Sequence, residues 1–406
     1  MSSDRPRALM ISENEGLPGD RRIWAEARTL TEAGYEVTAI CAMAQGEDQP
    51  RRETLEGIAI RRFPLRAASG PAGYVREYAQ ALVRIRRLAA EAEREAGPFD
   101  VVHLSNPPDF LGLAAAAQRR HGARIVFDHH DLVPELYRER FGRQGPLYRL
   151  LLAIERRTLR GADVVISTNE SFRRIAIERG GADPDAVFVV RNGPDLDRFT
   201  PVAADPALRR GKAHLLAYLG VMGPQDGIDR AIDALGELAR LRGDDWHAVF
   251  IGDGEVVPAM QARAEELGIG DVVEFAGWRG DDDIRAWLDR RRLHRAGPPG
   301  PLNDASTMVK IPEYMAMGRP IVSFDLAETR VSAGDAALYA ASAEPEALAH
   351  RIDELLEDPE RARRMGEEGR RRVAGLSWEQ SAAVLLEAYG SLTAARRAEP
   401  AAVQAV

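Results

Sequence analysis

Residues 301–330 bring several groups that can bind an anion close to one predicted helix. Four polar residues that are typical helix N-caps precede an expected helix over 308–317, which Gly318 would end: Asn303, Asp304, Ser306 and Thr307. The first turn of a helix has free backbone N–H groups and the positive end of the helix dipole. We therefore predict that this stretch binds a diphosphate.

Lys310 belongs to the first turn of this expected helix. Of the 55 basic residues in the chain, 53 are arginine, and the two lysines are Lys212 and Lys310. A compact ammonium group suits an anionic leaving group, and the simpler interpretation is a solvated surface lysine. Glu313 follows on the same helix face and can accept two hydrogen bonds from ribose hydroxyls; its simpler interpretation is an ion pair with Lys310.

The run EYMAMGRP at residues 313–320 resembles the signature of retaining glycosyltransferase family 4. That signature has a Glu, seven residues, a second Glu, an Ala-Met-Ala-like turn, Gly and Pro. Ala305 stands where the first Glu is expected, so Asp304 or Ser306 would have to contact the donor sugar, while Glu313 would hold the ribose. The Asn-Asp-x-Ser-Thr-Met-x-Lys pattern is most similar to a branch of bacterial surface-polysaccharide transferases.

This resemblance implies the GT-B fold, an α/β architecture of two Rossmann-like doubly wound domains facing across a cleft. We expect an acceptor-side domain over 1–196, completed by a C-terminal helix over 377–395, a nucleotide-sugar-binding domain over 197–376, and a disordered tail over 396–406. The implied enzyme transfers a hexosyl or N-acetylhexosaminyl group, from a UDP-sugar by preference, to a lipid-linked or polysaccharide acceptor in cell-surface glycan synthesis. A nucleotide-sugar 2-epimerase of the same fold and a non-catalytic nucleotide-sugar-binding protein are the alternatives.

Apolar segments rich in Val and Ile alternate with helical segments through both halves of the chain, which predicts parallel doubly wound sheets. Ligands of such sheets gather at the carboxyl ends of the strands. Three polar clusters in the first half are expected there, at residues 105–109, 128–131 and 167–170. The loop after the first strand has no G-x-G-x-x-G pattern, so an ordinary dinucleotide site is disfavoured.

The middle cluster, DHHD at 128–131 followed by Pro134 and Glu135, resembles the family's His-Asp-x-x-Pro-Glu region. There a histidine approaches the reacting sugar, which assigns His130 and Asp131 to the catalytic site, with His129 as the second choice. A histidine that only orders the loop and metal ligation by the pair are the alternatives. The resemblance also assigns four residues to the acceptor side, the first three of them in a helix start that would otherwise be a plain cap: Gly19, Asp20, Arg21 and Glu135.

The second half departs from the family at the loop after its first strand. The usual Gly-Arg-x-x-x-x-Lys-Gly has Val221 and Asp226 at its two cationic positions, so phosphate binding must depend on Lys310 and on backbone amides. The resulting donor site comprises ten residues: Gly220, Val221, Met222, Gly252, Asp304, Ser306, Thr307, Met308, Lys310 and Glu313.

Composition excludes several other classes of protein. The formal net charge of −8 and its concentration in the C-terminal half argue against nucleic-acid binding. The single cysteine, Cys41, excludes intrachain disulfides and cysteine-based zinc sites, and no convincing Asp-x-Asp or H-E-x-x-H motif occurs, so we expect no cofactor and no metal requirement. Without a long apolar run or a signal-peptide core, the chain is expected to be cytoplasmic.

Two segments carry unusual arginine runs. Residues 289–297 lie where the alternation of strands and helices predicts a buried strand, yet four arginines occupy residues 290–295. This suggests a frameshift in the gene or in its recorded sequence, and resequencing of this region would decide between the two readings. Residues 138–160 hold seven arginines interleaved with leucines, which indicates a basic amphipathic helix. Such a helix can lie on anionic lipid at the inner face of the plasma membrane, or its apolar side can simply pack on the sheet.

Overall fold

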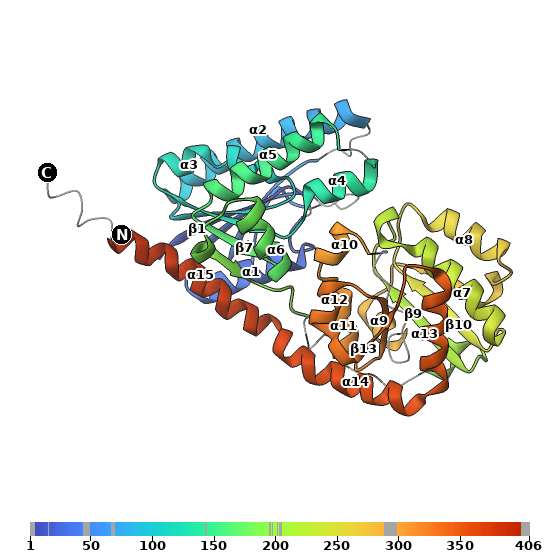
Figure 1. The fold of residues 1–406 in the computed structure, drawn as a ribbon. Helices are drawn as coiled ribbons and strands as arrows, with labels where there is room; N and C mark the ends of the chain where they lie inside the picture. Colours follow the sequence, from blue (N-terminus) through green and yellow to red (C-terminus); the bar gives the residue numbers. More distant parts are fainter. Residues whose placement is uncertain are drawn as a thin grey trace, which may run out of the picture. The chain divides into compact units, whose positions relative to one another are not determined.

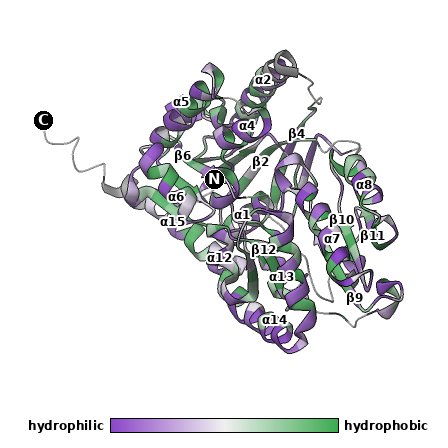
Figure 2. Ribbon diagram, turned by 45° about the vertical axis from the view of Figure 1, so that its right-hand side comes forward, coloured by the Kyte–Doolittle hydropathy of each residue, from purple (hydrophilic) through white to green (hydrophobic). Residues whose placement is uncertain are grey.

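The computed structural model describes residues 5–14, 16–43, 49–65, 70–142, 144–194, 196, 198–200, 202, 205–287 and 299–398 (Figure 1). These fall into two compact units. Unit 1 consists of Met1–Arg191 and Ser381–Val406, and unit 2 of Asn192–Gln380. The expected disordered tail over 396–406 lies largely outside the described residues, since the last helix runs to Ala398. Helices of both units alternate hydrophilic and hydrophobic stretches, typical of helices that bury one face (Figure 2).

Unit 1 is built on an eight-stranded sheet with the order β3-β4-β2-β1-β5-β6-β7-β8. All neighbours are parallel except β3, which is antiparallel to β4. The strands are β1 Arg7–Ser12, β2 Glu36–Ala42, β3 Arg52–Leu55, β4 Ile58–Phe63, β5 Val101–Ser105, β6 Arg124–His129, β7 Val164–Ser167 and β8 Val187–Val189. Ser12 pairs with Ser105, and Ser105 pairs with Asp128, so the carboxyl ends of β1, β5 and β6 lie level at one edge.

Helices cover this sheet and bury apolar residues against it. They are α1 Arg21–Glu32, α2 Gly70–Ala96, α3 Ala116–Arg120, α4 Val133–Phe141, α5 Pro146–Gly161, α6 Glu170–Arg174 and α15 Trp378–Ala398, with a 3-10 turn at Asp109–Leu113. The last helix, α15, packs on unit 1 through Leu385, Ala388, Tyr389 and Leu392, whose spacing lines one helix face. The ring of Tyr389 meets that of Tyr35 edge-on at 5.5 Å between centroids.

The single amphipathic helix expected over 138–160 is wrong. The segment forms two helices, because α4 ends at Gly142, which has a left-handed φ of 61°, and α5 begins only at Pro146. Leu159 of α5 is buried, whereas Leu147 and Leu150 are 48% and 54% exposed. Four arginines of α5 are exposed like these two leucines: Arg149, Arg156, Arg157 and Arg160.

Unit 2 contains two parallel sheets with the orders β11-β10-β9 and β12-β13. Its strands are β9 His214–Leu219, β10 Trp246–Ile251, β11 Val273–Gly277, β12 Ile321–Phe324 and β13 Ala337–Ala340. Its helices are α7 Ile228–Arg242, α8 Val257–Glu266, α9 Asp281–Trp287, α10 Pro301–Ala305, α11 Lys310–Ala316, α12 Ala327–Ala333, α13 Pro345–Glu357 and α14 Pro359–Val373. Within residues 205–287 and 299–398 no strand joins β9 to β12, and the arginine run at 289–297 lies outside the described residues.

The fold is thus α/β with mainly parallel sheets in both units, as the sequence predicts. Two apolar clusters of unit 2 enclose both of its sheets, with Phe250 and Phe324 in one and Ile251 and Ile321 in the other. Strands buried on both faces account for the continuous apolar runs that the sequence shows.

Candidate functional site

Asn106, which follows β5, fixes the loop that carries His130 and Asp131. Its Oδ1 accepts the backbone N–H of His130 at 2.9 Å and that of Asp131 at 3.0 Å. Its Nδ2 donates to the carbonyl of Asp131 at 2.7 Å and to Asp109 Oδ1 at 2.8 Å. Asn106 belongs to the polar cluster predicted at residues 105–109, where no role was predicted for it, and in the structure it is the side chain that orders the loop.

His130 is held by a buried ion pair. Its Nδ1 lies 2.8 Å from Asp128 Oδ2, and both oxygens of Asp128 also accept from Arg22, at 2.8 Å from Nε and 2.7 Å from Nη2. Burial alone would lower the pKa of His130, but the Asp128 carboxylate outweighs it and raises the pKa to about 9. At neutral pH the ring is therefore an imidazolium that donates hydrogen bonds, which suits charge stabilisation rather than proton removal.

Arg22, in the first turn of α1, is the arginine that contacts Asp128, the partner of His130. Arg21, the predicted residue, lies exposed at the first position of the helix, and Asp20 caps the helix by accepting the N–H of Ile23 at 3.1 Å. Gly19 is exposed beside them. The sequence contains one indication of this contact. Glu26 follows Arg22 by four residues, and residues at this spacing share a helix face and can form an ion pair.

Glu135 and His129 take part in a separate buried cluster. Both oxygens of Glu135 accept from the guanidinium of Arg179, which also donates to Glu155 Oε1 at 2.6 Å. His129 is fully buried, with Nε2 3.7 Å from Glu155 Oε1 and its ring against Phe172. Of the two histidines, His130 is therefore the one with exposed surface, 17% of its side chain. Asp131 is half-buried, and burial raises its pKa.

In unit 2, Lys310 lies directly against the loop that follows β9. Its Nζ donates to Tyr218 Oη at 2.7 Å, stands 4.4 Å from the centroid of the same ring and lies 3.9 Å from Asp226 Oδ1. A Cβ added at Gly220 would stand 3.0 Å from this nitrogen. The side chain is 13% exposed, so the interpretation as a solvated surface lysine is wrong. Burial lowers the pKa of Lys310.

The loops after β9 and β10 pack backbone against backbone. Gly220 and Gly252 have φ values of 144° and 126°, and a Cβ at Gly252 would stand 2.1 Å from the carbonyl oxygen of Gly220. Met222 donates its N–H to the carbonyl of Asp253 at 3.0 Å. Val221, in place of the family's arginine, is 57% exposed. This close contact requires glycine at 252 and keeps the peptide groups near Lys310 in place.

Asp226 takes the place of the family's lysine in this loop. Its Oδ2 accepts the N–H of Gly223 at 3.0 Å, while Oδ1 faces Lys310. Lys310 supplies the positive charge at this loop from a different part of the chain.

The expected N-caps over 303–307 are wrong in their local structure. Asn303, Asp304 and Ala305 belong to a short helix of their own, α10, and α11 begins at Lys310 with no side-chain cap. Ser306 Oγ donates to the carbonyl of Leu302 at 2.7 Å, and Thr307 Oγ1 donates to Glu328 Oε2 at 3.3 Å. Helix α10 was not predicted, although it begins at Pro301 and proline is common at the first position of a helix.

The remaining predicted donor residues lie around the start of α11. Glu313 is buried one turn after Lys310, and Met308 packs partly buried against the apolar clusters. Asp304 is half-buried, and burial raises its pKa. The structure therefore gathers Gly220, Lys310 and Glu313 around one loop and one helix start.

Residues 19–193 match the glycosyl transferase 4-like domain family, and residues 213–358 match the glycosyl transferases group 1 family. The chain is a glycosyltransferase of the GT-B fold. This glycosyltransferase is 27% identical over 397 residues to the D-inositol 3-phosphate glycosyltransferase of Salinispora arenicola, covering 91% of this chain and 86% of that one.

Solved structures of glycosyltransferases share its fold. Sucrose-phosphate synthase from Thermosynechococcus elongatus superposes with a TM-score of 0.76 at 19% identity, over 96% of this chain and 100% of that one. Anabaena HepE in complex with UDP and glucose gives a TM-score of 0.71 at 17% identity, over 95% and 100%. None of the described helices of this glycosyltransferase is long and apolar enough to cross a membrane.

Proposed function

We propose that this glycosyltransferase is a retaining enzyme that moves a hexosyl or N-acetylhexosaminyl group from a UDP-sugar to a lipid-linked or polysaccharide acceptor of a cell-surface glycan. The observation that carries the donor assignment is the ammonium of Lys310, buried against the Gly220 loop. A desolvated cation is suited to the charge of a leaving diphosphate. Binding of UDP and glucose by Anabaena HepE supports the choice of nucleotide.

Each residue of the donor site has a distinct task in this proposal. Lys310 stabilises the diphosphate as the glycosidic bond breaks, and Glu313 accepts hydrogen bonds from the ribose. The N–H groups of Gly220, Met222 and Gly223 already donate within unit 2, so the cation is the main contribution of this loop region. His130, as an imidazolium, donates to an oxygen of the donor sugar or the acceptor. The leaving diphosphate takes the acceptor's proton on the same face of the sugar, so the protein contributes orientation and charge stabilisation without a covalent intermediate and, in this proposal, without a metal.

The acceptor is proposed to be reached at a membrane surface. Leu147 and Leu150 of α5 are about half exposed, and Arg149, Arg156 and Arg157 are exposed on the same helix. Exposed leucines beside arginines suit the headgroup region of an anionic bilayer. We place the enzyme at the inner face of the plasma membrane, where it binds peripherally.

Turnover of nucleotide sugars tests the proposal. UDP-glucose, UDP-galactose, UDP-N-acetylglucosamine and GDP-mannose are incubated with the protein, with and without a lipid extract as acceptor source, and free nucleotide, 2-epimer and labelled glycolipid are measured. Transfer that needs the acceptor and keeps the anomeric configuration supports the proposal. Epimer formed without acceptor would indicate the 2-epimerase alternative, and binding of the donor without any turnover would indicate a binding protein.

A further inference from the structure

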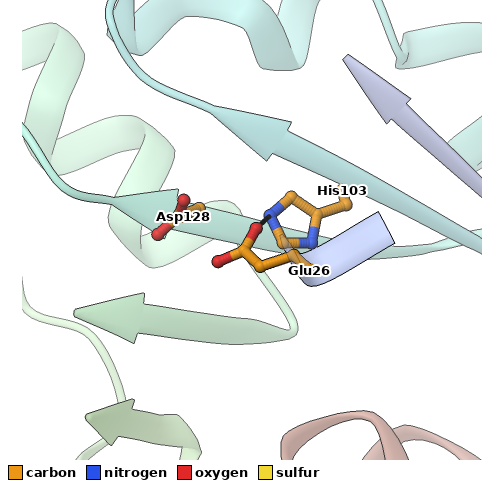
Figure 3. A group of neighbouring side chains, drawn as sticks. All are labelled: Glu26, His103 and Asp128. Atoms are coloured by element: carbon orange, nitrogen blue, oxygen red, sulfur yellow. Dashed lines mark ion pairs between the residues drawn. The ribbon is translucent and has the colours of Figure 1, made fainter. Parts of the chain in front are cut away.

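Asp128, the partner of His130, also belongs to a group of fully buried ionisable side chains. Glu26 of α1, His103 of β5 and Asp128 of β6 are neighbours and fully buried, and the Glu26 carboxylate lies against the His103 ring (Figure 3). Ligand atoms of the three lie within 4.8 Å of one another, a spacing that suits a metal ion. The cation of this group is, however, Arg22, whose Nη2 lies 2.7 Å from Asp128 Oδ1 and 3.2 Å from Glu26 Oε1.

These side chains form a continuous chain of polar contacts that ends on the last helix of the protein. His103 Nε2 lies 3.3 Å from Glu26 Oε2, and His103 Nδ1 lies 2.9 Å from the hydroxyl of Tyr389 on α15. Arg22 also donates from Nη1 to the carbonyl of Val190 at 3.0 Å, next to β8. Arg22 of α1 contacts Asp128 of β6 directly and also contacts Glu26 and Val190. His103 of β5 and then Tyr389 of α15 follow from Glu26, so the contacts connect α1, β5, β6, α15 and the end of β8.

Burial sets the protonation of the supporting residues. It raises the pKa of Glu26 to about 8, with the nearby Asp128 carboxylate adding to the effect, and it lowers the pKa of His103 to about 4. At neutral pH Glu26 therefore carries a proton and His103 is neutral, with its Nδ1 sharing a hydrogen bond with the hydroxyl of Tyr389. Arg22 and His130 hold the pKa of Asp128 well below its usual range against the effect of burial. Among these contacting side chains, Asp128 therefore carries the negative charge.

We propose that Asp128 is a positioning residue for His130, which it holds through Nδ1 so that the Nε2–H is the free donor, and that Arg22, Glu26, His103 and Tyr389 hold Asp128 in place. The role rests on the proposed function, in which His130 donates to a reacting oxygen. A carboxylate that accepts from one ring nitrogen fixes the orientation of the ring and stabilises its charged form, in which the other nitrogen also carries a proton. Other charged groups that face His130 are Asp20, Asp131, Arg22 and Glu26.

The first test measures the pKa of His130 in the absence of substrate. Protein labelled with ¹⁵N-histidine is titrated from pH 5 to pH 10, and His130 is assigned by its absence in a His130→Gln variant. Wild-type His130 should titrate near pH 9, and Asp128→Asn should move the midpoint down to about 6.5 or below, the ordinary value for histidine. Asp163→Asn is the matched control, since Asp163 also pairs with an arginine, Arg124, but precedes β7 at the opposite edge of the sheet.

The second test separates positioning from a purely structural role. Asp128→Asn should lower kcat about 100-fold with the donor KM within about threefold, and should shift the upper limb of the pH–rate profile downward. Tyr389→Phe removes one hydroxyl at the far end of the chain and should lower kcat by about threefold to tenfold while the protein stays folded. Because the NMR titration needs no turnover, failure of the proposed activity leaves the titration result standing.

Two outcomes would overturn the proposal. A wild-type His130 that titrates near 6.5 would show that Asp128 does not hold it, and this result needs no variant to fold. An Asp128→Asn protein with the lowered His130 pKa but an unchanged pH–rate profile would show that the contact has no part in the reaction.

Discussion

The ammonium of Lys310 lies 2.7 Å from the hydroxyl of Tyr218 and 4.4 Å from the centre of the same ring, and 92 residues separate the two in sequence. A phosphate that replaces or joins this contact gains a desolvated charge-assisted hydrogen bond. We expect Lys310→Ala to weaken UDP binding by about 2 kcal/mol, roughly 30-fold in Kd, measured by calorimetry.

The chain offers a close control for this variant. Lys212, the other lysine, pairs on the surface with Asp244 at 2.6 Å, and Lys212→Ala should leave the Kd for UDP unchanged. Lys310→Arg should recover only part of the loss, because a planar guanidinium does not fit the space beside Gly220 as the ammonium does. If the Lys310→Ala and Lys212→Ala proteins bind UDP with equal affinity, Lys310 is not part of the donor site.

Glu313 gives the second prediction. Glu313→Ala should weaken binding of UDP by roughly 1.5–3 kcal/mol through loss of hydrogen bonds to the ribose, with a smaller effect on binding of inorganic diphosphate. Glu346→Ala, at an exposed position in the first turn of α13, is the control for a helical carboxylate. If both ligands lose affinity equally, Glu313 acts through Lys310 instead of the ribose.

Membrane contact is tested with vesicles. Changing Arg149, Arg156 and Arg157 together to Gln should strongly reduce co-sedimentation with anionic vesicles, since each arginine near an anionic surface contributes about 1 kcal/mol. Binding should also decrease steeply with salt. The same loss of three charges in unit 2, at Arg240, Arg363 and Arg371, should have little effect. If the two triple variants co-sediment equally, or if wild type co-sediments equally with neutral and anionic vesicles, this surface does not bind the membrane.

The raised pKa of Glu26 predicts how stability changes with pH. Between the ordinary value of 4.5 and the folded value of about 8, the folded state holds a proton that the unfolded state has lost. The contribution is complete below pH 4.5 and is lost as pH rises through 8, so the Tm of unit 1 should fall over this range. His130 acts in the same direction between about 6.5 and 9.

A Glu26→Gln variant tests this linkage because it stays neutral. Its Tm should decrease less than that of wild type between pH 6 and pH 8.5, in scanning calorimetry. Glu346→Gln at the exposed position should keep the wild-type slope. Parallel curves for Glu26→Gln and wild type would mean that Glu26 is already ionised at neutral pH.

Local patterns in the sequence predict the elements that bury apolar side chains. The sequence predicts strands over 7–12 and 58–63 and helices over about 227–242 and 345–356, and β1, β4, α7 and α13 lie within a residue or two of these bounds. Strand β3 was missed because its residues, RETL, are half-exposed and carry two charges, so no apolar run marks it. The start of helix α4 was not predicted, although Pro134 stands in its first turn, where proline is common.

The site was predictable only in part, for a related reason. Family resemblance indicates His130, Lys310 and Glu313 through motifs that are local in sequence. Arg22 and Asp128 stand 106 residues apart and meet only because parallel strands bring α1 beside β6. No periodicity predicts such a contact, so the pair of Arg22 and Asp128 was not predicted, and Arg21 stays a prediction for the acceptor side.

Helix α15 imposes a condition on any attempt to produce unit 1 by itself. The chain enters this helix from unit 2, yet Tyr389 is fully buried among Tyr35 and His103 of unit 1. An expression fragment that stops at residue 191 would therefore expose an apolar groove and lose the hydroxyl next to His103. A gene that joins codons 381–398 behind codon 191 through a flexible linker restores the missing helix, and a cut at the single boundary suggested by the family matches does not.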